Sequence, residues 1–453
     1  MSVFKGLFCG SVNGSSSKEN NKVKEEEELY DDSALKDFYQ KVRNSRRLDD
    51  SFALEDDIDL TQSEIDEINQ FWGKYKFAYP EIDYKSFKTF KNRYGKFDVR
   101  HCPGAIKTRY LNKYFVNNAY NMAYQNKGLL RRLYPSVKMP RTIIRRLNGL
   151  YYDENYNPLS YNDAIQVICD ESMDGKKMIV KPSGLGGGRG IFFIEPNESL
   201  EKIKSEIKSV GINAFVIQEL LIQSDFMKQF NPTSVNTLRI SSLIWKGDVH
   251  ILATLVRVGK VGNAVDNYSQ GGILLGVNSE TGQCNSWALT HDHERIKSLP
   301  SGVILDQVPI VIPNFDIIRD TVRRLHFCNP YTKYISWDIA LDENDMPVLI
   351  EANHAGMTQM HEAVTGPLFG DLTEEILDEY LLKRFSLQLK TKDWLCSEFH
   401  DHIVIEKYIG EDDTIYITDR IKDKDVTLIK ANALPSPINK RITCSDRILK
   451  MIK

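Results

Sequence analysis

Apolar residues follow two patterns along the chain: short runs bounded by glycine or proline, and longer stretches with the spacing of an amphipathic helix. Runs of the first kind are typical of strands, and stretches of the second kind are typical of helices. Strands are predicted at residues 178–180, 191–194, 215–220, 234–244, 249–258, 335–341 and 347–353. Helices are predicted at residues 160–168 and 200–210. The chain is therefore expected to have an α+β fold.

The hairpin made by the first two strands has a glycine-rich tip, Lys181-Pro182-Ser183-Gly184-Leu185-Gly186-Gly187-Gly188-Arg189-Gly190. Glycine reaches positive φ without a steric penalty, so successive backbone N–H groups can turn toward one anion. Lys181 and Arg189 add positive charge beside these donors. A polyphosphate fits such a tip best, and the alternative is an ordinary flexible hairpin.

Two commoner glycine motifs do not account for this loop. A dinucleotide-binding loop opens a helix whose N-terminus holds the pyrophosphate, whereas residues 191–194 are apolar and typical of a strand. A Walker loop ends in Gly-Lys-Ser/Thr, whereas Gly190 is followed here by Ile191. The loop is therefore expected to be a flap between two strands.

The composition is that of an ordinary enzyme, with 42% hydrophobic and 27% charged residues over 453 positions. The net charge of −3 gives no electrostatic reason to expect a nucleic acid or a membrane as partner. The seven cysteines are scattered without a Cys-x-x-Cys pair, which favours a reducing compartment over a zinc ribbon or a disulfide scaffold. With no run of about 18 apolar residues and no signal peptide, a cytoplasmic protein without a membrane span is expected.

Changes in composition divide the chain into five segments. The first is rich in Ser, Asn, Lys and Glu and is expected to be mobile, because it cannot bury enough apolar surface to order itself. The second is expected to be helical and opens with a capping box, Thr61-Gln62-Ser63-Glu64. The predicted segments are a mobile tail (1–55), a helical cap (56–121), a first lobe with the glycine flap (122–212), a second lobe (213–386) and a C-terminal extension (387–453).

Two acidic residues are predicted to meet on neighbouring strands. A turn centred on Asn344-Asp345 places Asp338 directly opposite Glu351. Two like charges in this position are destabilising unless a cation or a proton lies between them. Asn353 shares the face of Glu351, and such an all-oxygen set suits a Mg²⁺ ion that also binds phosphate oxygens and water. A register shift of one residue would place the two acids on opposite faces.

Two arginines lie in predicted strands after the glycine flap, and two pairs of consecutive arginines lie in the predicted first lobe before the flap. Arg239 alternates with apolar residues and therefore faces away from the apolar side of its strand, toward solvent or a cleft. Arg257 lies in the next strand, and the polar loop 262–272 that follows is either a binding loop or a long hairpin turn. Arg131-Arg132 and Arg145-Arg146 are interpreted as solvated faces of a helix and a strand, not as a phosphate track.

Eight motifs follow one another over about residues 60–386. They are Lys127, Met178-Ile179-Val180-Lys181-Pro182 with the glycine flap, Val216-Ile217-Gln218-Glu219, Ser234-Val235-Asn236-Thr237-Leu238-Arg239-Ile240, Val265-Asp266-Asn267, Gly271-Gly272, Trp337-Asp338 and Glu351-Ala352-Asn353. In this order they resemble the ATP-grasp superfamily, and more closely its sugar-transfer-associated ATP-grasp family. The resemblance implies an ATP-grasp fold of two α+β lobes with the nucleotide between them. The helical N-terminal cap and the small C-terminal extension are additional to that fold.

The resemblance also implies roles for individual residues. The residues implied to bind ATP are Lys127, Lys181, Gly186, Gly187, Gly188, Arg189, Gly190, Gln218, Glu219, Leu220 and Asp225. The residues implied to hold one or two Mg²⁺ ions are Asp338, Glu351 and Asn353. Arg239 and Arg257 are the candidate catalytic residues, because guanidinium groups bind phosphate or carboxylate in a two-pronged way. The residues expected to bind the acceptor or to position the flap are Asp266, Asn267, Gly271 and Gly272.

The activity implied by the resemblance is that of an ATP- and Mg²⁺-dependent ligase, which joins a carboxylate to an amine or a thiol through an acyl phosphate. The resemblance also implies an association with the glycosyltransferases of surface-polysaccharide assembly. It therefore implies a sugar or polysaccharide precursor as substrate and possible contact with the glycosyltransferase machinery. Two alternatives stay open: a kinase for a hydroxyl of a sugar-like substrate, and a nucleotide-binding protein without turnover.

The chain departs from the family pattern at two points. His354 stands where relatives often have proline, and it is either an acceptor contact or a structural histidine. The chain also lacks the Rossmann-like domain that precedes the lobes in many ATP-grasp ligases. Since that domain often helps to bind the acceptor, the sequence leaves the acceptor unassigned.

Overall fold

The computed structural model describes residues 58–75, 82–183, 188–211, 213–262, 266, 268–354 and 360–384, together with four strands near the C-terminus. The predicted mobile tail, residues 1–55, lies outside the described residues. None of the described helices is long and apolar enough to cross a membrane.

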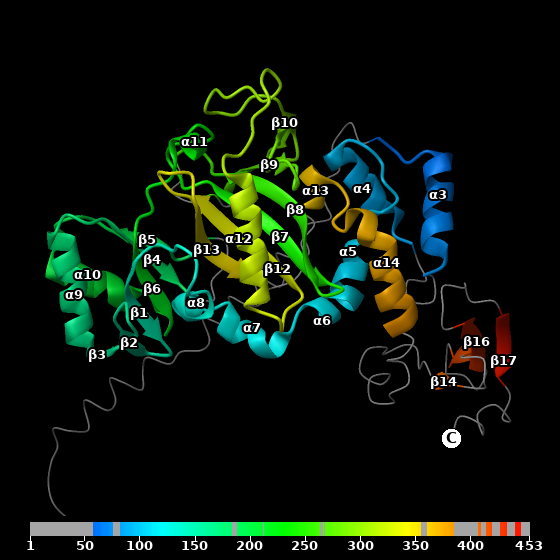
Figure 1. Cartoon of the computed structure of the whole chain (residues 1–453), viewed down its shortest axis with the longest axis horizontal. Helices are drawn as coiled ribbons and strands as arrows, with labels where there is room; N and C mark the ends of the chain where they lie inside the picture. Colours follow the sequence, from blue (N-terminus) through cyan, green and yellow to red (C-terminus); the bar gives the residue numbers. More distant parts are fainter. Residues whose placement is uncertain are drawn as a thin grey trace, which may run out of the picture. The chain divides into compact units, whose positions relative to one another are not determined.

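The first lobe is built on a six-stranded sheet with the strand order β3-β2-β1-β6-β4-β5 (Figure 1). Its strands are β1 (Thr142–Leu147), β2 (Leu150–Tyr152), β3 (Pro158–Leu159), β4 (Met178–Pro182), β5 (Phe192–Ile194) and β6 (Phe215–Glu219). Two helices, α9 (Tyr161–Met173) and α10 (Leu200–Ser209), pack apolar residues against one face of this sheet. The glycine-rich hairpin is formed by β4 and β5, as predicted.

Strand β6 lies at the centre of this sheet, hydrogen-bonded to β1 on one side and to β4 on the other. The predicted lobe boundary between residues 212 and 213 is therefore wrong by one strand, because it assigned β6 to the second lobe. The preceding short helices η3 (Lys127–Leu129) and α8 (Leu130–Leu133) were predicted in the first lobe, but Leu130 and Tyr134 pack into the core of the second. Apolar pattern alone does not specify which sheet a buried strand joins.

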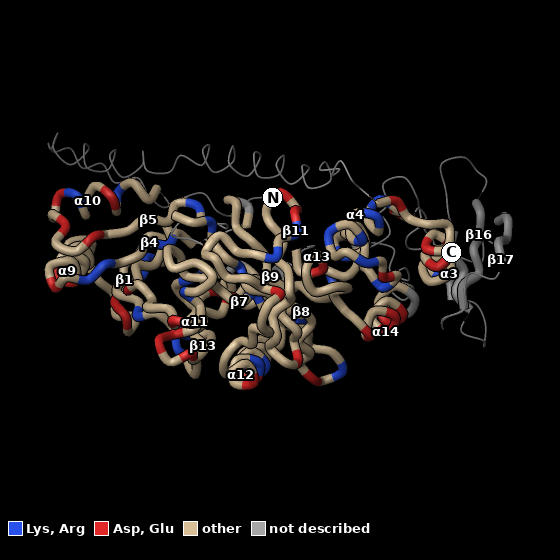
Figure 2. The backbone as a smooth tube through the Cα atoms, turned by 90° about the horizontal axis from the view of Figure 1, so that it is seen from above, with Lys and Arg blue, Asp and Glu red and all other residues tan. Residues whose placement is uncertain are grey.

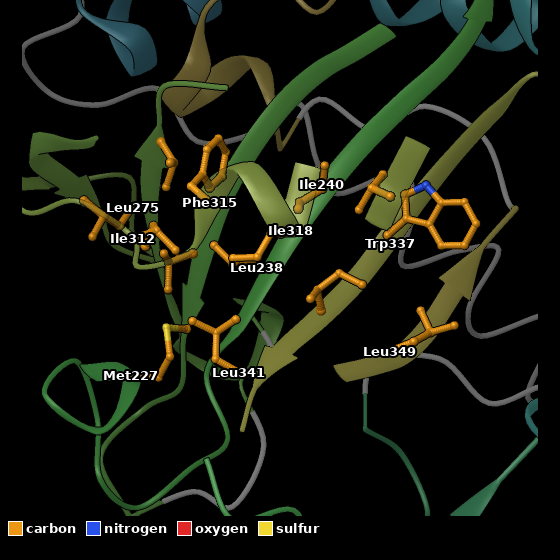
Figure 3. Packing of buried hydrophobic residues seen from close by; sticks show 14 of the residues in the cluster. Met227, Leu238, Ile240, Leu275, Ile312, Phe315, Ile318, Trp337, Leu341 and Leu349 are labelled. Carbon is orange, nitrogen blue, oxygen red and sulfur yellow. The ribbon is translucent and has the colours of Figure 1, made fainter. Parts of the chain in front are cut away.

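The second lobe is built on a seven-stranded sheet with the order β11-β10-β9-β8-β7-β12-β13. Its strands are β7 (Thr237–Trp245), β8 (Asp248–Val258), β9 (Ile273–Val277), β10 (Cys284–Leu289), β11 (Arg295–Ile296), β12 (Tyr334–Leu341) and β13 (Pro347–Asn353). Helix α12 (Phe315–Phe327) lies across one face, where Phe315 and Ile318 pack against Leu238, Ile240 and Trp337 (Figures 1 and 3). We call this the α12 face of the sheet.

The opposite face of this sheet holds a polar site at one end and helices at the other. Helix α13 (Glu362–Thr365) packs against Leu255 and Leu274. Farther along, Leu243 and Tyr334 belong to one core with helices of the N-terminal cap. The cap helices are α3 (Gln62–Gly73), α4 (Tyr84–Tyr94), α5 (Gly104–Ile106), η2 (Lys107–Leu111), α6 (Asn112–Phe115) and α7 (Asn118–Tyr124).

Helix α3 begins at the capping box that the sequence predicts. Thr61 Oγ1 accepts a hydrogen bond from the Glu64 backbone N–H at 3.3 Å, and Glu64 Oε2 accepts one from the Thr61 N–H at 2.7 Å. Ile68 and Trp72 on the buried side of the helix join the core of the cap. The predicted helical cap is therefore present over the described part of residues 56–121.

Three further helical segments follow α13: η5 (Gly370–Leu372), α14 (Thr373–Leu377) and η6 (Asp378–Arg384). Near the C-terminus a separate four-stranded antiparallel sheet has the order β14-β15-β16-β17. Its strands are β14 (Glu406–Tyr408), β15 (Thr414–Thr418), β16 (Val426–Asn432) and β17 (Lys440–Cys444). The described part of the predicted C-terminal extension, residues 387–453, is therefore this sheet. In Figure 2, Lys and Arg are interspersed with Asp and Glu over the described residues.

The loop that joins β12 and β13 is one residue longer than the predicted one. The Asp342 N–H donates to the Met346 carbonyl at 3.0 Å, so the loop has three residues rather than two. Asp345 takes a positive φ of 57°, the left-handed conformation that such three-residue hairpins use at their last position. Near the turn, the cross-strand pairs are therefore displaced by one residue from the predicted register.

A β-bulge at Ile350 restores the predicted register at the functional end of the hairpin. Ile339 pairs with Leu349, but the next pair is Asp338 with Glu351, so Ile350 is an extra residue on β13. The predicted pairing of Asp338 with Glu351 is confirmed. It holds because the loop is one residue longer than predicted and the bulge adds one residue to β13, so that the two shifts in register cancel each other.

Candidate active site

A cavity of about 510 Å³ lies between the inner face of the first sheet and the polar end of the second. The first sheet contributes Ile179 and Lys181 of β4 and Phe193 of β5. The second sheet contributes acidic, amide and guanidinium groups from β7, β8, β12 and β13. A volume of this size is typical of pockets for small molecules and cofactors.

Three charged residues form one row across the second sheet because of its register. Asp338 of β12 pairs with Glu351 of β13 on one side and with Arg239 of β7 on the other. Directly opposed residues of antiparallel strands project to the same face, so all three side chains lie opposite the α12 face. Arg239 was predicted to face solvent or a cleft, and it lines the cavity, so the second alternative holds.

Asp338 is held by two arginines. Arg239 Nη2 donates to Asp338 Oδ2 at 3.1 Å, and Arg239 Nε lies 2.5 Å from Oδ1. Arg257 Nη2 lies 3.0 Å from Asp338 Oδ2. Burial works against the charged form of Asp338, but both guanidinium groups outweigh it and lower the pKa of this carboxyl. Asp338 is therefore an anion at neutral pH.

Arg257 also connects Asp338 with the loop that follows β8. Its Nε and Nη2 donate to Thr237 Oγ1 at 3.1 and 2.9 Å, and Nε lies 3.3 Å from Asp266 Oδ2. Thr237 in turn donates its hydroxyl proton to Asp266. Burial raises the pKa of Asp266 above its ordinary value. Burial alone would lower the pKa of Arg257, but the negative charges of Asp266 and Asp338 outweigh it and raise that pKa above its ordinary value.

The two lysines of the cavity are in different environments. Lys127 Nζ forms an ion pair with Glu351 Oε1 at 2.7 Å. Lys181 Nζ donates to Gln218 Oε1 at 3.1 Å, and Gln218 Nε2 donates to Thr142 at 3.0 Å. Burial, with the positive charge of Lys127 as a second cause, lowers the pKa of Lys181 to about 8. An anion bound beside Lys181 would restore its ordinary pKa.

The side chains of Asp338, Glu351 and Asn353 fit a hard divalent cation. All three line the cavity and offer only oxygen ligands, which Mg²⁺ prefers. Asn353 Nδ2 donates to Asp338 Oδ2 at 3.4 Å, and Asp338 Oδ1 has Arg239 Nε, at 2.5 Å, as its ion-pair partner. In the described part of the chain no three His, Cys, Asp or Glu side chains converge, so a cation here would need amide, phosphate or water oxygens as well.

Most of the predicted site residues come together around this cavity, and some do not. Those that line it are Lys127, Lys181, Gly188, Glu219, Leu220, Arg239, Arg257, Asp266, Asp338, Glu351 and Asn353. Gln218 reaches it through its hydrogen bond with Lys181. Those that lie outside the described residues are Gly186, Gly187 and Asn267. The roles of all these residues stay predictions.

Five predicted residues do not line the cavity. Arg189 and Gly190 are exposed in the flap. Gly271 and Gly272 follow the short helix η4 (Tyr268–Gln270). Asp225 begins helix α11 (Asp225–Lys228), is 95% exposed and pairs with Lys228 at 2.7 Å. Its predicted contact with ATP would need its side chain to turn away from Lys228.

Several apolar residues of the cavity were not predicted as site residues, and three of them are instructive. Ile179 and Phe193 line it from the first sheet, and Ile350 lines it from the second. Ile179 shares a face with Lys181, so the period of two in β4 could have identified it. The position of Ile350 follows from the β-bulge, which lets Ile350 and Glu351 both reach the cavity although they are consecutive.

The structure also decides how His354 and Arg145 are to be interpreted. His354 is fully buried, does not line the cavity, and its Nδ1 lies 3.3 Å from Asn329 Nδ2, as expected of a structural histidine. Arg145 was interpreted as part of a solvated strand face, which is wrong, because only 3% of its surface is exposed. It belongs to the inner face of the first sheet.

A family model described as sugar-transfer-associated ATP-grasp matches residues 119–370, more than half of the chain. The chain therefore belongs to the sugar-transfer-associated ATP-grasp family and has the ATP-grasp fold of two α+β lobes. No curated protein matches it in sequence.

Several solved ATP-grasp structures resemble the chain. The ATP-grasp ligase PsnB in complex with a minimal precursor is 13% identical, with a TM-score of 0.32 over 58% of this chain and 63% of that one. The L-amino acid ligase from Bacillus licheniformis is 13% identical, with a TM-score of 0.32 over 58% and 49%. D-alanyl-alanine synthetase A from Vibrio cholerae is 11% identical, with a TM-score of 0.37 over 62% and 73%. The chain spans less than two thirds of the length of the first two proteins.

Proposed function

We propose that this protein is an ATP- and Mg²⁺-dependent ligase that activates a carboxylate as an acyl phosphate and passes the acyl group to an amine or a thiol. The observation that supports it most is the collection of Lys181, two guanidinium groups and three oxygen ligands around one cavity of the ATP-grasp fold. Family membership further favours a sugar or a polysaccharide precursor as the molecule that is modified.

The nucleotide would occupy the cavity with its base at the apolar side and its phosphates at the charged side. Ile179, Phe193 and Ile350 offer apolar surface for a purine ring. Glu219 and Leu220, where the chain passes from one lobe to the other, offer backbone groups for the edge of the ring. Lys181 and the glycine flap would hold the phosphates, since flexible glycine backbone and a lysine provide several donors to one anion.

The acidic wall of the cavity would hold the metal. Asp338, Glu351 and Asn353 are its ligands in this proposal, and the ion would neutralise charge on the β- and γ-phosphates. Lys127 Nζ forms an ion pair with Glu351 Oε1 at 2.7 Å, and a bound phosphate could draw this ammonium group away from the carboxylate. The arginine pair keeps Asp338 ionised, which a metal ligand requires.

The two arginines would stabilise the reacting groups. A carboxylate oxygen attacks the γ-phosphorus and ADP leaves, which forms the acyl phosphate. The amine nitrogen then attacks the acyl carbon and phosphate leaves, while the amine loses a proton. The described contacts of Arg239 and Arg257 use Nε and Nη2, so each guanidinium group also has Nη1 donors to offer to oxygens that gain negative charge.

A trapping experiment separates this ligase from a kinase. Purified protein is incubated with Mg²⁺, ATP, hydroxylamine and a library of amino acids, peptides, amino sugars and sugar acids. The ligase proposal predicts a hydroxamate and an equal amount of ADP for the correct carboxylate. A kinase would release ADP with a hydroxyl substrate and form no hydroxamate, and no ADP release with any substrate would favour a binding protein without turnover.

A further inference from the structure

A second cavity, of about 370 Å³, adjoins the nucleotide cavity. Lys127, Pro140 and Ile350 line both cavities. The second cavity continues along the inner face of the first sheet, from β6 to β1, where Gln218 and Arg145 line it. We call it the β1 cavity.

The register of the first sheet relates the two cavities. Val216 of β6 pairs with Lys181 of β4 on one side and with Arg145 of β1 on the other. Opposed residues share a face, so Lys181 and Arg145 lie in one row, about 10 Å apart along the hydrogen-bonding direction. Gln218 lies next to this row and bridges Lys181 and Thr142. The β1 cavity therefore lies beside the phosphate-binding lysine, on the side away from the flap.

The lining of the β1 cavity is strongly cationic. It holds five cationic side chains, Lys127, Arg131, Lys138, Arg141 and Arg145, and a single carboxylate, Glu154. Three of the five are neutralised by carboxylates: Lys127 by Glu351, Lys138 by Asp342, and Arg141 by acidic residues of β6 and α9. Among the residues that the structure describes, neither Arg131 nor Arg145 has a carboxylate within salt-bridge distance.

Arg145 is the more unusual of these two residues because it is almost completely buried. Its Nη1 donates to the Asp153 carbonyl at 2.6 Å, and its guanidinium carbon lies 4.1 Å from the centre of the Tyr156 ring. Tyr156 is itself fixed by a hydrogen bond from its hydroxyl to the Gly128 carbonyl at 2.9 Å. Burial disfavours the charge on Arg145 and lowers its pKa. A buried guanidinium without a carboxylate is costly unless an anion accompanies it.

Arg131 approaches the same cavity from helix α8. Its Nη1 donates to the Val137 carbonyl at 3.0 Å, and this contact leaves the other nitrogens of the guanidinium group available. Two guanidinium groups around one cavity form a suitable site for an oxyanion, because each presents planar paired donors. Thr142 and Asn155 add neutral hydrogen-bonding groups to the lining.

We propose that the β1 cavity binds the phosphate or carboxylate group of a small molecule other than the nucleotide, with Arg131 and Arg145 as its main contacts. The volume suits a molecule the size of an amino acid or a phosphorylated sugar. The shared wall at Lys127 brings such a molecule next to the nucleotide phosphates. The two main contacts come from α8 and β1, so the proposal does not need the ligase reaction to be correct.

Calorimetry with simple anions tests the proposal. Inorganic phosphate and succinate are titrated separately into the full chain, first without nucleotide and then with saturating Mg²⁺ and a non-hydrolysable ATP analogue. The variants are Arg131→Gln, Arg145→Gln and, as a matched control, Arg132→Gln. Arg132 also contacts the Tyr156 ring, at 3.9 Å, but does not line the cavity. Thermal unfolding of each variant shows whether it is folded.

The expected result is that one of the two anions binds at one site and still binds when the nucleotide analogue is present. Arg131→Gln and Arg145→Gln should each weaken that binding about tenfold or more, the effect of one lost charge-assisted hydrogen bond. Arg132→Gln should change it less than twofold. The anion that binds more tightly shows whether the natural ligand carries a phosphate or a carboxylate group. If Arg145→Gln does not fold, the affinity of the folded Arg131→Gln variant decides the outcome.

Three results would overturn the proposal. The first is that neither anion binds to the wild-type protein. The second is that Arg132→Gln weakens binding as much as Arg131→Gln, which would indicate a general effect of net charge. The third is that the nucleotide analogue displaces the anion and Lys181→Gln, not Arg131→Gln, weakens its binding. That last result would place the anion in the nucleotide cavity and would leave the proposed ligase function intact.

Discussion

Two clusters of charged residues lie on the second lobe, and they differ in what surrounds them. The closed cluster consists of Lys107, Glu362 and His101, between the helical cap and α13, with each residue no more than 3% exposed. The open cluster consists of Arg239, Arg257, Asp266 and Asp338, and all four of its residues line the cavity between the two lobes.

In the closed cluster one carboxylate receives all the donors. Glu362 pairs with Lys107 and lies 3.3 Å from His101 Nδ1. It also accepts backbone N–H groups from Cys102 at 3.3 Å and from Leu368 at 3.1 Å. Burial works against the charged form, but Lys107 and His101 outweigh it and lower the pKa of Glu362. None of the three residues of the closed cluster lines the cavity between the lobes or the β1 cavity, so we expect their interactions to serve the fold.

In the open cluster the charges are only partly matched by the protein. Burial raises the pKa of Asp266 although Arg257 Nε lies 3.3 Å from its Oδ2. A cavity next to such groups lets a ligand or a metal supply the missing partners. The comparison indicates that substitutions in the closed cluster will change stability, whereas substitutions around the open cluster will change ligand binding and turnover.

The largest expected effect is on the closed cluster. Glu362→Gln removes the charge that Lys107 and His101 need, and a buried cation without its partner costs about 3–5 kcal/mol. We expect the free energy of unfolding in urea to fall by that amount. The control is Glu374→Gln, which removes an exposed ion pair with Lys74 and should cost less than about 1 kcal/mol. Equal losses for the two variants would contradict the structural role of the closed cluster.

Acid should remove the difference between wild type and Glu362→Gln. The pKa of Glu362 in the folded protein is lower than its ordinary value of 4.5, so its contribution is complete above that pH. As the pH falls further, the unfolded chain binds the proton first and the contribution is lost. The gap between the unfolding free energies of the two proteins should therefore narrow from pH 7 down to pH 3, and a constant gap would contradict the assignment.

The next effect concerns the open side of the comparison. Glu351→Gln replaces a proposed metal ligand and should lower the rate of ATP turnover by about 10²–10³-fold, the range for the loss of one transition-state contact. The free energy of unfolding should change by less than about 1 kcal/mol, since this carboxylate lies at a cavity wall. Glu343→Gln, in the exposed turn of the same hairpin, is the control and should keep wild-type turnover. Full activity of Glu351→Gln would contradict the metal assignment.

A smaller effect is expected from pH on nucleotide binding. The pKa of Lys181 is about 8 because the side chain is buried, so the ammonium group is charged below pH 8 and neutral above it. The affinity for an ATP analogue should be constant from pH 6.5 to 7.5 and should then fall by up to tenfold per pH unit. Titration of Lys181→Met over the same range should remove the dependence. A wild-type affinity that stays flat up to pH 9.5 would show that this lysine does not contact the phosphates.

The smallest expected effect is in the cap. Thr61→Ala removes the side-chain oxygen that accepts from the Glu64 N–H and should lower the free energy of unfolding by about 1 kcal/mol. Ser63→Ala, an exposed change in the same turn, is the control and should have little effect. Nucleotide affinity should be the same for both variants. A loss of nucleotide binding in Thr61→Ala would mean that the cap and the open cluster are coupled.

The sequence was sufficient for the parts of the fold that depend on local pattern. The capping box of α3, the hairpin of the glycine flap and the orientation of Arg239 away from the apolar face of its strand follow from residue type and periodicity. The pairing of Asp338 with Glu351 was also predicted, although the turn was one residue longer than expected and only the bulge at Ile350 restored the register.

Features that depend on long-range packing could not be predicted in this way. Arg145 lies in a strand whose two faces look similar in sequence, and only the pairing of β1 with β6 shows that it is buried. The closed cluster joins Lys107 to Glu362 across 255 positions, and neither residue lies in a motif. Such contacts are set by the packing of the cap on the second lobe, for which local periodicity carries no signal.

The central claim is that the cavity between the two lobes binds a nucleotide together with Mg²⁺. Its most direct test is a calorimetric titration of a non-hydrolysable ATP analogue into the wild-type protein and into Glu351→Gln, each with Mg²⁺ and with a chelator. The account predicts saturable binding at one site of the wild type, weakened about tenfold or more by the chelator, and a chelator effect that is lost in Glu351→Gln. Binding that is absent, or that is the same in all four titrations, would contradict it.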